Sequence, residues 1–257
     1  MEVVLAALVL ALGTFIFVNA RNVRARAHSR EAAALARDTT MVGAGLVQGT
    51  VRRKLIPAGK GQSTSPEEMR RRVLNLASGT YVNDILSEQD SALYRWPDRL
   101  SDALRVYIEP TSSVAGFDAR YPEMGRTVFA EWSEAGFPLR FTFIYDTTSA
   151  DITIRWIDRF ASGEGQRIGV TERIQTSQFQ IAKARIAIAN HDSTGRALSV
   201  ATVGGIIRHE IGHALGLNHA NDPTSVMYRE SATSTIGNSD RATLRLLYLV
   251  PGGSLKE

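Results

Sequence analysis

The stretch HEIGHALGLNH occupies residues 209–219. It lies at the end of an apolar segment with helical spacing, residues 198–215, so His209 and His213 stand one turn apart on one helix face. Its five fixed identities, three of them the uncommon histidine, arise by chance in a chain of this length only on the order of once in 10^5. Three of the chain's five histidines fall in this stretch. We therefore predict a metal site here rather than a core helix with incidental histidines.

Each polar residue of the motif has a chemical reason for its position. Glu210 lies about 100° around the helix from His209, close enough to meet a metal-activated water as a general base without being a ligand. Gly216 accepts left-handed backbone, so it can end the helix abruptly and let the chain bring His219 to a third coordination position. Three protein ligands leave a fourth position for water, as catalytic zinc requires. The predicted ligands of one catalytic zinc are His209, His213 and His219.

The segments before the motif alternate between strand and helix patterns. A helix opened by Pro122 and ended by Gly136 follows the first strand, and a last helix runs from about residue 239 to 249. The candidate strands are residues 105–109, 139–145, 151–156, 167–174 and 179–189. These patterns predict a five-stranded mixed sheet with an active-site helix and a C-terminal helix.

The motif resembles the zinc site of the metzincin metallopeptidases, HExxHxxGxxH followed by a Met-turn. Residues 225–228 read SVMY and are similar to that turn, which places Met227 beneath the zinc ligands. A Tyr directly after the Met resembles the matrixin branch. The segments ADITIRW (residues 150–156) and SDRATLRLLY (residues 239–248) are similar to bacterial matrixin-type domains, so the resemblance covers roughly residues 95–250.

The resemblance implies an α+β, metzincin-like catalytic domain with an antiparallel edge strand beside the zinc cleft. Residues 167–174 are the candidate for that edge, along which an extended peptide could pair. The implied activity is that of a zinc-dependent endopeptidase acting on protein or peptide substrates, with a zinc-activated water and Glu210 as general base. The alternative is a catalytically silent, zinc-bearing module that binds peptides at a membrane surface.

Several features depart from the animal matrixins. The histidines outside the motif are His28 and His191, which argues against a second, structural zinc. The chain has no cysteine, so disulfides, thiolate metal sites and a blocking cysteine are excluded. Asp90 could block zinc instead, although a surface carboxylate is the preferred interpretation. Calcium ligands are also conceivable, but solvated charge fits better because no calcium loop is recognisable among Asp151, Asp158, Glu164 and Asp192.

The N-terminal quarter of the chain differs from the rest. Residues 3–18 form an uncharged apolar run, so residues 1–20 are predicted to be a membrane anchor or a signal segment. Either form favours a membrane-anchored or secreted protein with an extracytoplasmic catalytic domain. Residues 21–64 read as a basic, flexible linker. Residues 65–94 read as a helical extension or pro-segment, which SPEE at residues 65–68 opens as a capping box. The predicted catalytic domain follows at residues 95–250, and residues 251–257 form a tail.

The positive charge is confined to one segment. Residues 21–72 hold 12 Lys and Arg against 4 Asp and Glu, whereas residues 73–257 hold 18 against 21. The predicted domain is therefore slightly acidic, which excludes nucleic acid as its partner on electrostatic grounds. The basic segment could associate with anionic lipid or another acidic surface alongside proteolysis. No sequence feature indicates an oligomeric state.

Overall fold

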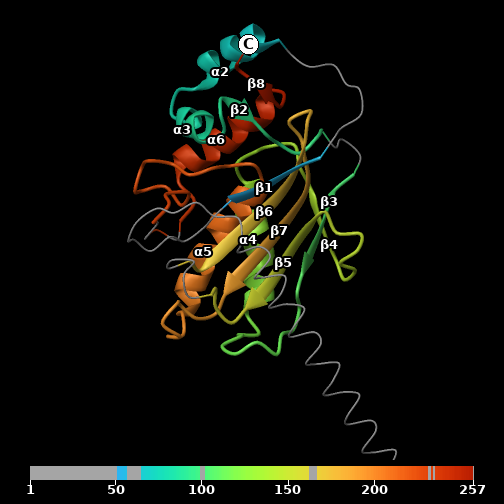
Figure 1. Cartoon of the computed structure of the whole chain (residues 1–257), viewed down its shortest axis with the longest axis vertical. Coiled ribbons are helices and arrows are strands. Elements are labelled where there is room, and N and C mark those ends of the chain that lie inside the picture. The colour runs from blue at the N-terminus through green and yellow to red at the C-terminus, as the bar shows by residue number, and fades with distance from the viewer. Residues whose placement is uncertain are drawn as a thin grey trace, which may run out of the picture.

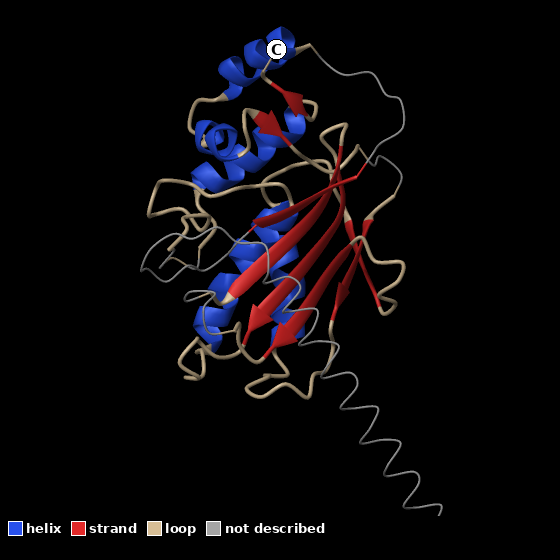
Figure 2. Ribbon diagram, in the orientation of Figure 1, coloured by secondary structure: helices blue, strands red, loops and turns tan. Residues whose placement is uncertain are grey.

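Strands and helices alternate along the chain and build one mixed sheet with helices packed on it (Figures 1 and 2). The computed structural model describes residues 51–56, 65–98, 102–161, 167–230, 233 and 235–256. The helices in these ranges are α2 (Pro66–Leu76), α3 (Val82–Glu88), α4 (Tyr121–Ser133), α5 (Val200–Ala214) and α6 (Asn238–Leu249). The strands are β1 (Val51–Ile56), β2 (Ala92–Leu93), β3 (Leu104–Ile108), β4 (Phe141–Ile144), β5 (Ile152–Ile157), β6 (Gly169–Thr176), β7 (Ile181–Ala189) and β8 (Gly253–Ser254). The predicted α+β class is confirmed.

The main sheet has the order β1-β6-β7-β5-β3-β4, and β2 pairs with β8 separately. Strands β7, β5, β3 and β4 run parallel, and β6 is antiparallel to β7. All five predicted strands are present, and the predicted antiparallel strand is β6.

A sixth strand changes the expected edge of the sheet. Strand β1 comes from the predicted linker and pairs with β6 in parallel, from Val51 opposite Thr171 to Ile56 opposite Thr176. The outer side of β6 is therefore occupied by the chain itself, contrary to the expectation of an open edge at residues 167–174. Sequence patterns missed β1 because its pairing rests on backbone groups, and its three consecutive basic residues hide any alternation.

The predicted helical extension, residues 65–94, shares its core with the domain predicted at 95–250. Met69, Ile85 and Leu93 are at most 1% exposed and belong to the same buried cluster as Trp96 and the apolar side chains of α5 and α6. The indole nitrogen of Trp96 donates to the carbonyl of Ala214 at the end of α5, at 2.8 Å. Helices α2, α3 and α6 gather at one end of the molecule in Figure 1.

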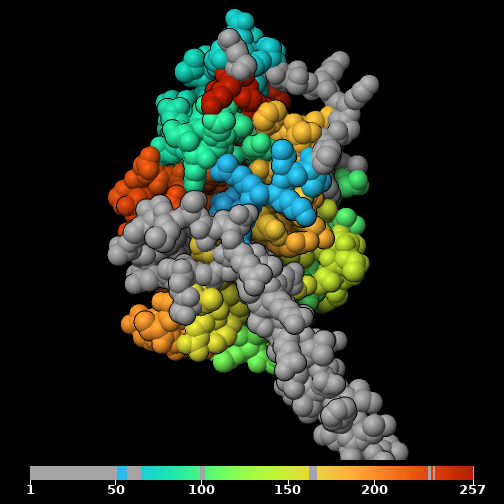
Figure 3. All heavy atoms as spheres, viewed as in Figure 1, coloured from blue at the N-terminus to red at the C-terminus, as the bar shows by residue number. Residues whose placement is uncertain are grey.

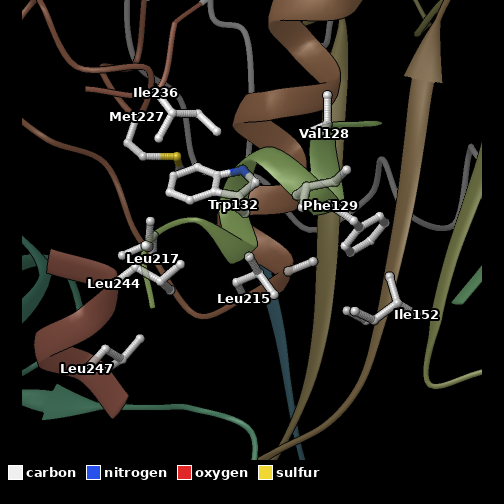
Figure 4. Close-up of a cluster of buried hydrophobic side chains, with 14 of the residues drawn as sticks. Val128, Phe129, Trp132, Ile152, Leu215, Leu217, Met227, Ile236, Leu244 and Leu247 are labelled. Carbon is white, nitrogen blue, oxygen red and sulfur yellow. The ribbon is translucent and has the colours of Figure 1, made fainter. Parts of the chain in front are cut away.

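The residues of α5 from Val203 to Ala214 are buried, with the exception of Arg208. Its N-cap is Ser199, whose hydroxyl accepts from the Thr202 backbone N–H. Helix α4 packs beside it, and the Trp132 indole of α4 donates to the Arg208 carbonyl at 3.1 Å. Figure 4 shows Trp132 within the apolar cluster that α4, α5 and α6 share. The polar side chains on the inner face of α5 are thus held away from water, where each needs a partner.

Several predicted segments lie outside the described residues. These are the anchor or signal at residues 1–20, its apolar run 3–18, and most of the linker at 21–64. Within the described part of the chain, every helix is too short or too polar to cross a membrane.

Candidate active site

Helix α5 presents three polar side chains to one buried site. His209 and His213 are one turn apart, and their ring centroids are 4.6 Å from each other. Glu210 lies between them in sequence, and all three residues are 0% exposed. This arrangement is the one expected from the spacing of the motif.

The third histidine reaches the site through a sharp turn after α5. Gly216 has φ +114°, and a Cβ there would lie 2.8 Å from the Tyr94 carbonyl oxygen and 2.7 Å from a Leu247 methyl carbon. Both the backbone angle and the close approach call for glycine. The turn brings the ring of His219 to 4.8 Å from that of His213 and 5.5 Å from that of His209.

Two buried polar side chains hold this turn. The Arg173 guanidinium, from β6, donates to Asn218 Oδ1 at 2.6 Å and to the carbonyls of His213 and Leu217 at 3.4 and 3.5 Å. Burial lowers the pKa of Arg173 to about 9. Gln89 also donates to Asn218 Oδ1. Carbonyls at a helix C-terminus lack helical partners, so a buried cation placed there stabilises the end of α5.

The Nδ1 atom of each histidine has an acceptor. His209 Nδ1 is 2.7 Å from the Val226 carbonyl oxygen, and His213 Nδ1 is 2.9 Å from that of Leu217. His219 Nδ1 is 3.0 Å from Glu88 Oε1. Carbonyl oxygens can only accept, so in His209 and His213 the proton lies on Nδ1 and the lone pair on Nε2.

The three Nε2 atoms are suited to hold a metal ion. They are buried and have no hydrogen-bond partner among the residues that the structure describes, and the three ligand atoms lie within 4.8 Å of one another. Among the described residues, this is the one group of at least three His, Cys, Asp or Glu side chains with that geometry. Burial lowers the pKa of His209 to about 3 and that of His213 well below its usual value, and the neighbouring histidines lower both further. Neutral imidazoles are the form that binds zinc.

Glu210 is fixed beside the histidines by strand β6. Its Oε2 accepts from the Thr171 hydroxyl at 2.6 Å, and its Oε1 has no partner in the described part of the chain. Burial raises the pKa of Glu210 to about 8, and the hydrogen bond from Thr171 acts against that rise. Strand β6 comes so close that a Cβ at Gly169 would lie 2.3 Å from Oε1.

The turn at residues 225–228 packs against α5 and contacts His209. Met227 is 0% exposed, and its sulfur packs against Gly212 of α5, where a Cβ would be 2.4 Å away. Figure 4 shows this sulfur beside the Trp132 indole. Asp240 of α6 accepts from the Ser225 hydroxyl and from the Val226 backbone N–H, which ties the turn to α6. The same turn supplies the acceptor for His209.

This geometry agrees with comparison to known proteins. The sequence profile of the family described as Matrixin matches residues 107–249, more than half of the chain. The chain belongs to the matrixin family. Membership supports a zinc metallopeptidase in general terms.

Two individual proteins are similar to this matrixin. Karilysin of Tannerella forsythia is 30% identical over 134 residues, which cover 49% of this chain and 27% of Karilysin. The chain thus matches only about a quarter of the length of that relative. A chain in the solved GM1-bound form of the ECX AB5 holotoxin has a TM-score of 0.43 and 17% identity, covering 65% of this chain and 88% of that one. The latter similarity is too low to support any assignment.

Besides Arg173 and Gln89, the structure adds three residues to the predicted site of this matrixin. Thr171 contacts Glu210, Glu88 contacts His219, and Asp240 holds the turn. Thr171 and Glu88 are 39 and 131 residues from their partners, so no local pattern could reveal them. Asp240 lies in the SDRATLRLLY segment, whose resemblance was noted without a role for the carboxylate.

The other carboxylates considered from sequence have protein partners. Asp90 is exposed and pairs with Lys256, as expected of a surface carboxylate rather than a zinc-blocking one. Three of the four calcium candidates lie in the described residues: Asp151 pairs with Arg105, Asp158 with His191, and Asp192 with Arg196. Glu164 lies outside the described residues. His191 Nδ1 lies 2.8 Å from Asp158 Oδ1, and His191 is not part of the three-histidine group.

Proposed function

We propose that this chain is a zinc-dependent endopeptidase with Glu210 as general base. The supporting observation is the convergence of three Nε2 atoms that have no hydrogen-bond partner among the described residues, together with a buried carboxylate on the helix that carries two of these histidines. A zinc ion held by His209, His213 and His219 would polarise a scissile carbonyl and acidify a water molecule. Glu210 would take the proton of that water and pass it to the leaving amine.

The two oxygens of Glu210 have different surroundings. Oε2 is held by Thr171, whereas Oε1 is buried and has no partner among the described residues. We therefore assign proton transfer to Oε1, since Oε2 already accepts a hydrogen bond. Thr171 is a positioning residue in this proposal, because it fixes the orientation of the carboxylate.

The Thr171→Val variant tests this positioning role. Valine has nearly the same shape but lacks the hydroxyl, so Glu210 loses its one side-chain partner. The hydrogen bond from Thr171 favours the ionised form of Glu210, which is the form that acts as base, and a bond to a charged group contributes about 1.5–3 kcal/mol. We therefore expect kcat to fall roughly 10- to 100-fold with little change in KM. Steady-state kinetics on a quenched peptide measure the effect. Thr171→Ser, which keeps the hydroxyl, should retain most of the activity; equal losses in both variants would argue against the role.

A pocket beside His219 offers space for part of a peptide. It has a volume of about 430 Å³ and is lined by Asp84, Ser87, Glu88, His219, Ala220, Asn221, Tyr228, Arg229 and Glu230. Its walls combine α3 with the segment after His219. We propose that a side chain of the peptide substrate occupies this pocket while the scissile bond lies at the three histidines.

Cleavage of a broad peptide library by the zinc-loaded chain tests the proposal as a whole. We expect one zinc per chain by elemental analysis and cleavage at internal peptide bonds by mass spectrometry. A chelator should abolish cleavage, and added zinc should restore it. A chain that binds one zinc but cleaves no peptide would instead be the silent binding module. Release of terminal residues alone would exclude the endopeptidase.

We also propose that the catalytic domain acts outside the cytoplasm, either anchored through residues 3–18 or secreted. This rests on the apolar run in the sequence, which lies outside the described residues. Membrane fractionation and N-terminal sequencing of the mature protein distinguish the retained anchor from the cleaved signal.

A further inference from the structure

The three histidines differ in what fixes their rings. The Nδ1 acceptors of His209 and His213 are backbone carbonyls of the Met-turn and of the turn after α5. His219 has instead a side-chain acceptor, Glu88 of α3, which lies 131 residues away in the chain. Glu88 also precedes the region that the matrixin profile matches, residues 107–249.

Glu88 forms two hydrogen bonds with His219. Its Oε1 accepts from the ring Nδ1 at 3.0 Å, and its Oε2 accepts from the His219 backbone N–H at 3.1 Å. Arg229 donates to Oε1 at 3.3 Å and holds the carboxylate from the other side. The carboxylate thereby orients both the ring and the backbone of His219. His219 needs this support because it is the one histidine of the three that no helix positions.

We propose that Glu88 is a positioning residue that keeps His219 ready to bind metal. A carboxylate on the outer ring nitrogen fixes the proton on Nδ1, directs Nε2 to the metal and makes the ligand more basic. The geometry of the metal site thus depends on the packing of α3 against the domain. This inference rests on the proposed zinc site, which it extends to the N-terminal helices.

Zinc affinity of the metal-free chain tests the proposal, measured by competition with a chromogenic chelator. Loss of such an outer partner commonly weakens metal binding 10- to 100-fold, and we expect a loss in this range for Glu88→Ala. Glu88→Gln keeps one oxygen as an acceptor for Nδ1, but its amide group then faces the His219 N–H. Its affinity should therefore fall between those of Glu88→Ala and the parent. Circular dichroism and thermal melting of each metal-free variant check folding.

Asp84→Ala is the matched control for helix docking. Asp84 lies on the same helix and accepts two hydrogen bonds from Asn221, at 2.9 Å each, without touching the His219 ring. Removal of the Asp84 carboxylate weakens the packing of α3 against the segment after His219. The zinc affinity should nevertheless stay within about threefold of the parent, because the His219 ring keeps Glu88 as its acceptor. Equal weakening by Asp84→Ala and Glu88→Ala, or parental affinity in Glu88→Ala, would overturn the proposal. Absence of zinc binding by the parent would instead refute the zinc site itself.

Discussion

Glu210→Ala is expected to keep the fold and the bound zinc while peptide-bond hydrolysis falls about 10²- to 10⁴-fold. Loss of a general base alone accounts for that range. The fold should survive because the Thr171 hydroxyl still has the Glu210 backbone carbonyl as an acceptor, at 3.0 Å. The buried Thr171 hydroxyl therefore keeps a hydrogen-bond partner in the variant. Hydrolysis of a quenched peptide, zinc content and circular dichroism measure the three properties.

His213→Ala is the matched comparison on the same helix. It should lose zinc as well as activity, because two histidines cannot hold zinc in a tetrahedral catalytic site. The pair of variants separates the base from the ligands, since only Glu210→Ala is inactive with its metal bound. If Glu210→Ala cleaves as fast as the parent, the proposed role of Glu210 is wrong.

The parts of this structure that sequence predicts well are those with local signals. Helix α5 follows from its apolar spacing, and Gly216 marks its end because a left-handed turn favours glycine. The two histidines of α5 share a face because their spacing matches the helical period. Even α2 begins as expected, with Ser65 accepting from the Glu68 backbone N–H.

The parts that sequence could not predict depend on contacts between distant segments. Thr171 is an ordinary strand residue until β6 passes beside α5 and places its hydroxyl on Glu210. Glu88 has the pattern of a solvated helix-end carboxylate, yet the return of the chain after Gly216 brings His219 to it. Arg173 is likewise 0% exposed, which the sequence does not predict because arginine side chains are rarely fully buried. The motif thus predicts the metal ligands, whereas only the tertiary fold shows what orients them.

Strand β1 has a consequence for substrate binding. It runs along the outer side of β6, and its first residue, Val51, pairs with Thr171, the residue that holds the base. An extended peptide pairing with the same side of β6 would have to take the place of β1. None of its side chains belongs to the apolar core clusters, and Leu55 is 64% exposed. Besides its backbone pairing, β1 contributes Arg52, which is 7% exposed, and Arg53, which donates to the Glu88 carbonyl at 3.3 Å. These contacts are polar and lie outside the apolar core clusters, so their loss does not open the core.

Deletion of residues 1–64 should therefore leave a folded enzyme with a lower KM for peptides and an unchanged kcat. A tethered segment competes at an effective concentration on the order of millimolar, so we expect KM to fall about tenfold or more. A synthetic peptide of residues 51–56, VRRKLI, should inhibit the truncated enzyme in trans, and a scrambled peptide of the same composition should not. An unchanged KM would show that β1 does not compete with substrate.

Extending the deletion through Trp96 is expected to unfold the domain rather than to activate it. This segment carries seven large side chains of the core, at most 8% exposed: Met69, Val73, Tyr81, Val82, Ile85, Leu93 and Trp96. Burial of each contributes roughly 1.5–3 kcal/mol, so their loss is on the order of 10 kcal/mol, as much as the whole stability of a typical domain. Circular dichroism and thermal melting of the two truncations make the comparison. A cooperative melt and peptide cleavage by the longer deletion would show that the predicted extension at residues 65–94 is a removable pro-segment, whereas loss of both would make it part of the catalytic domain.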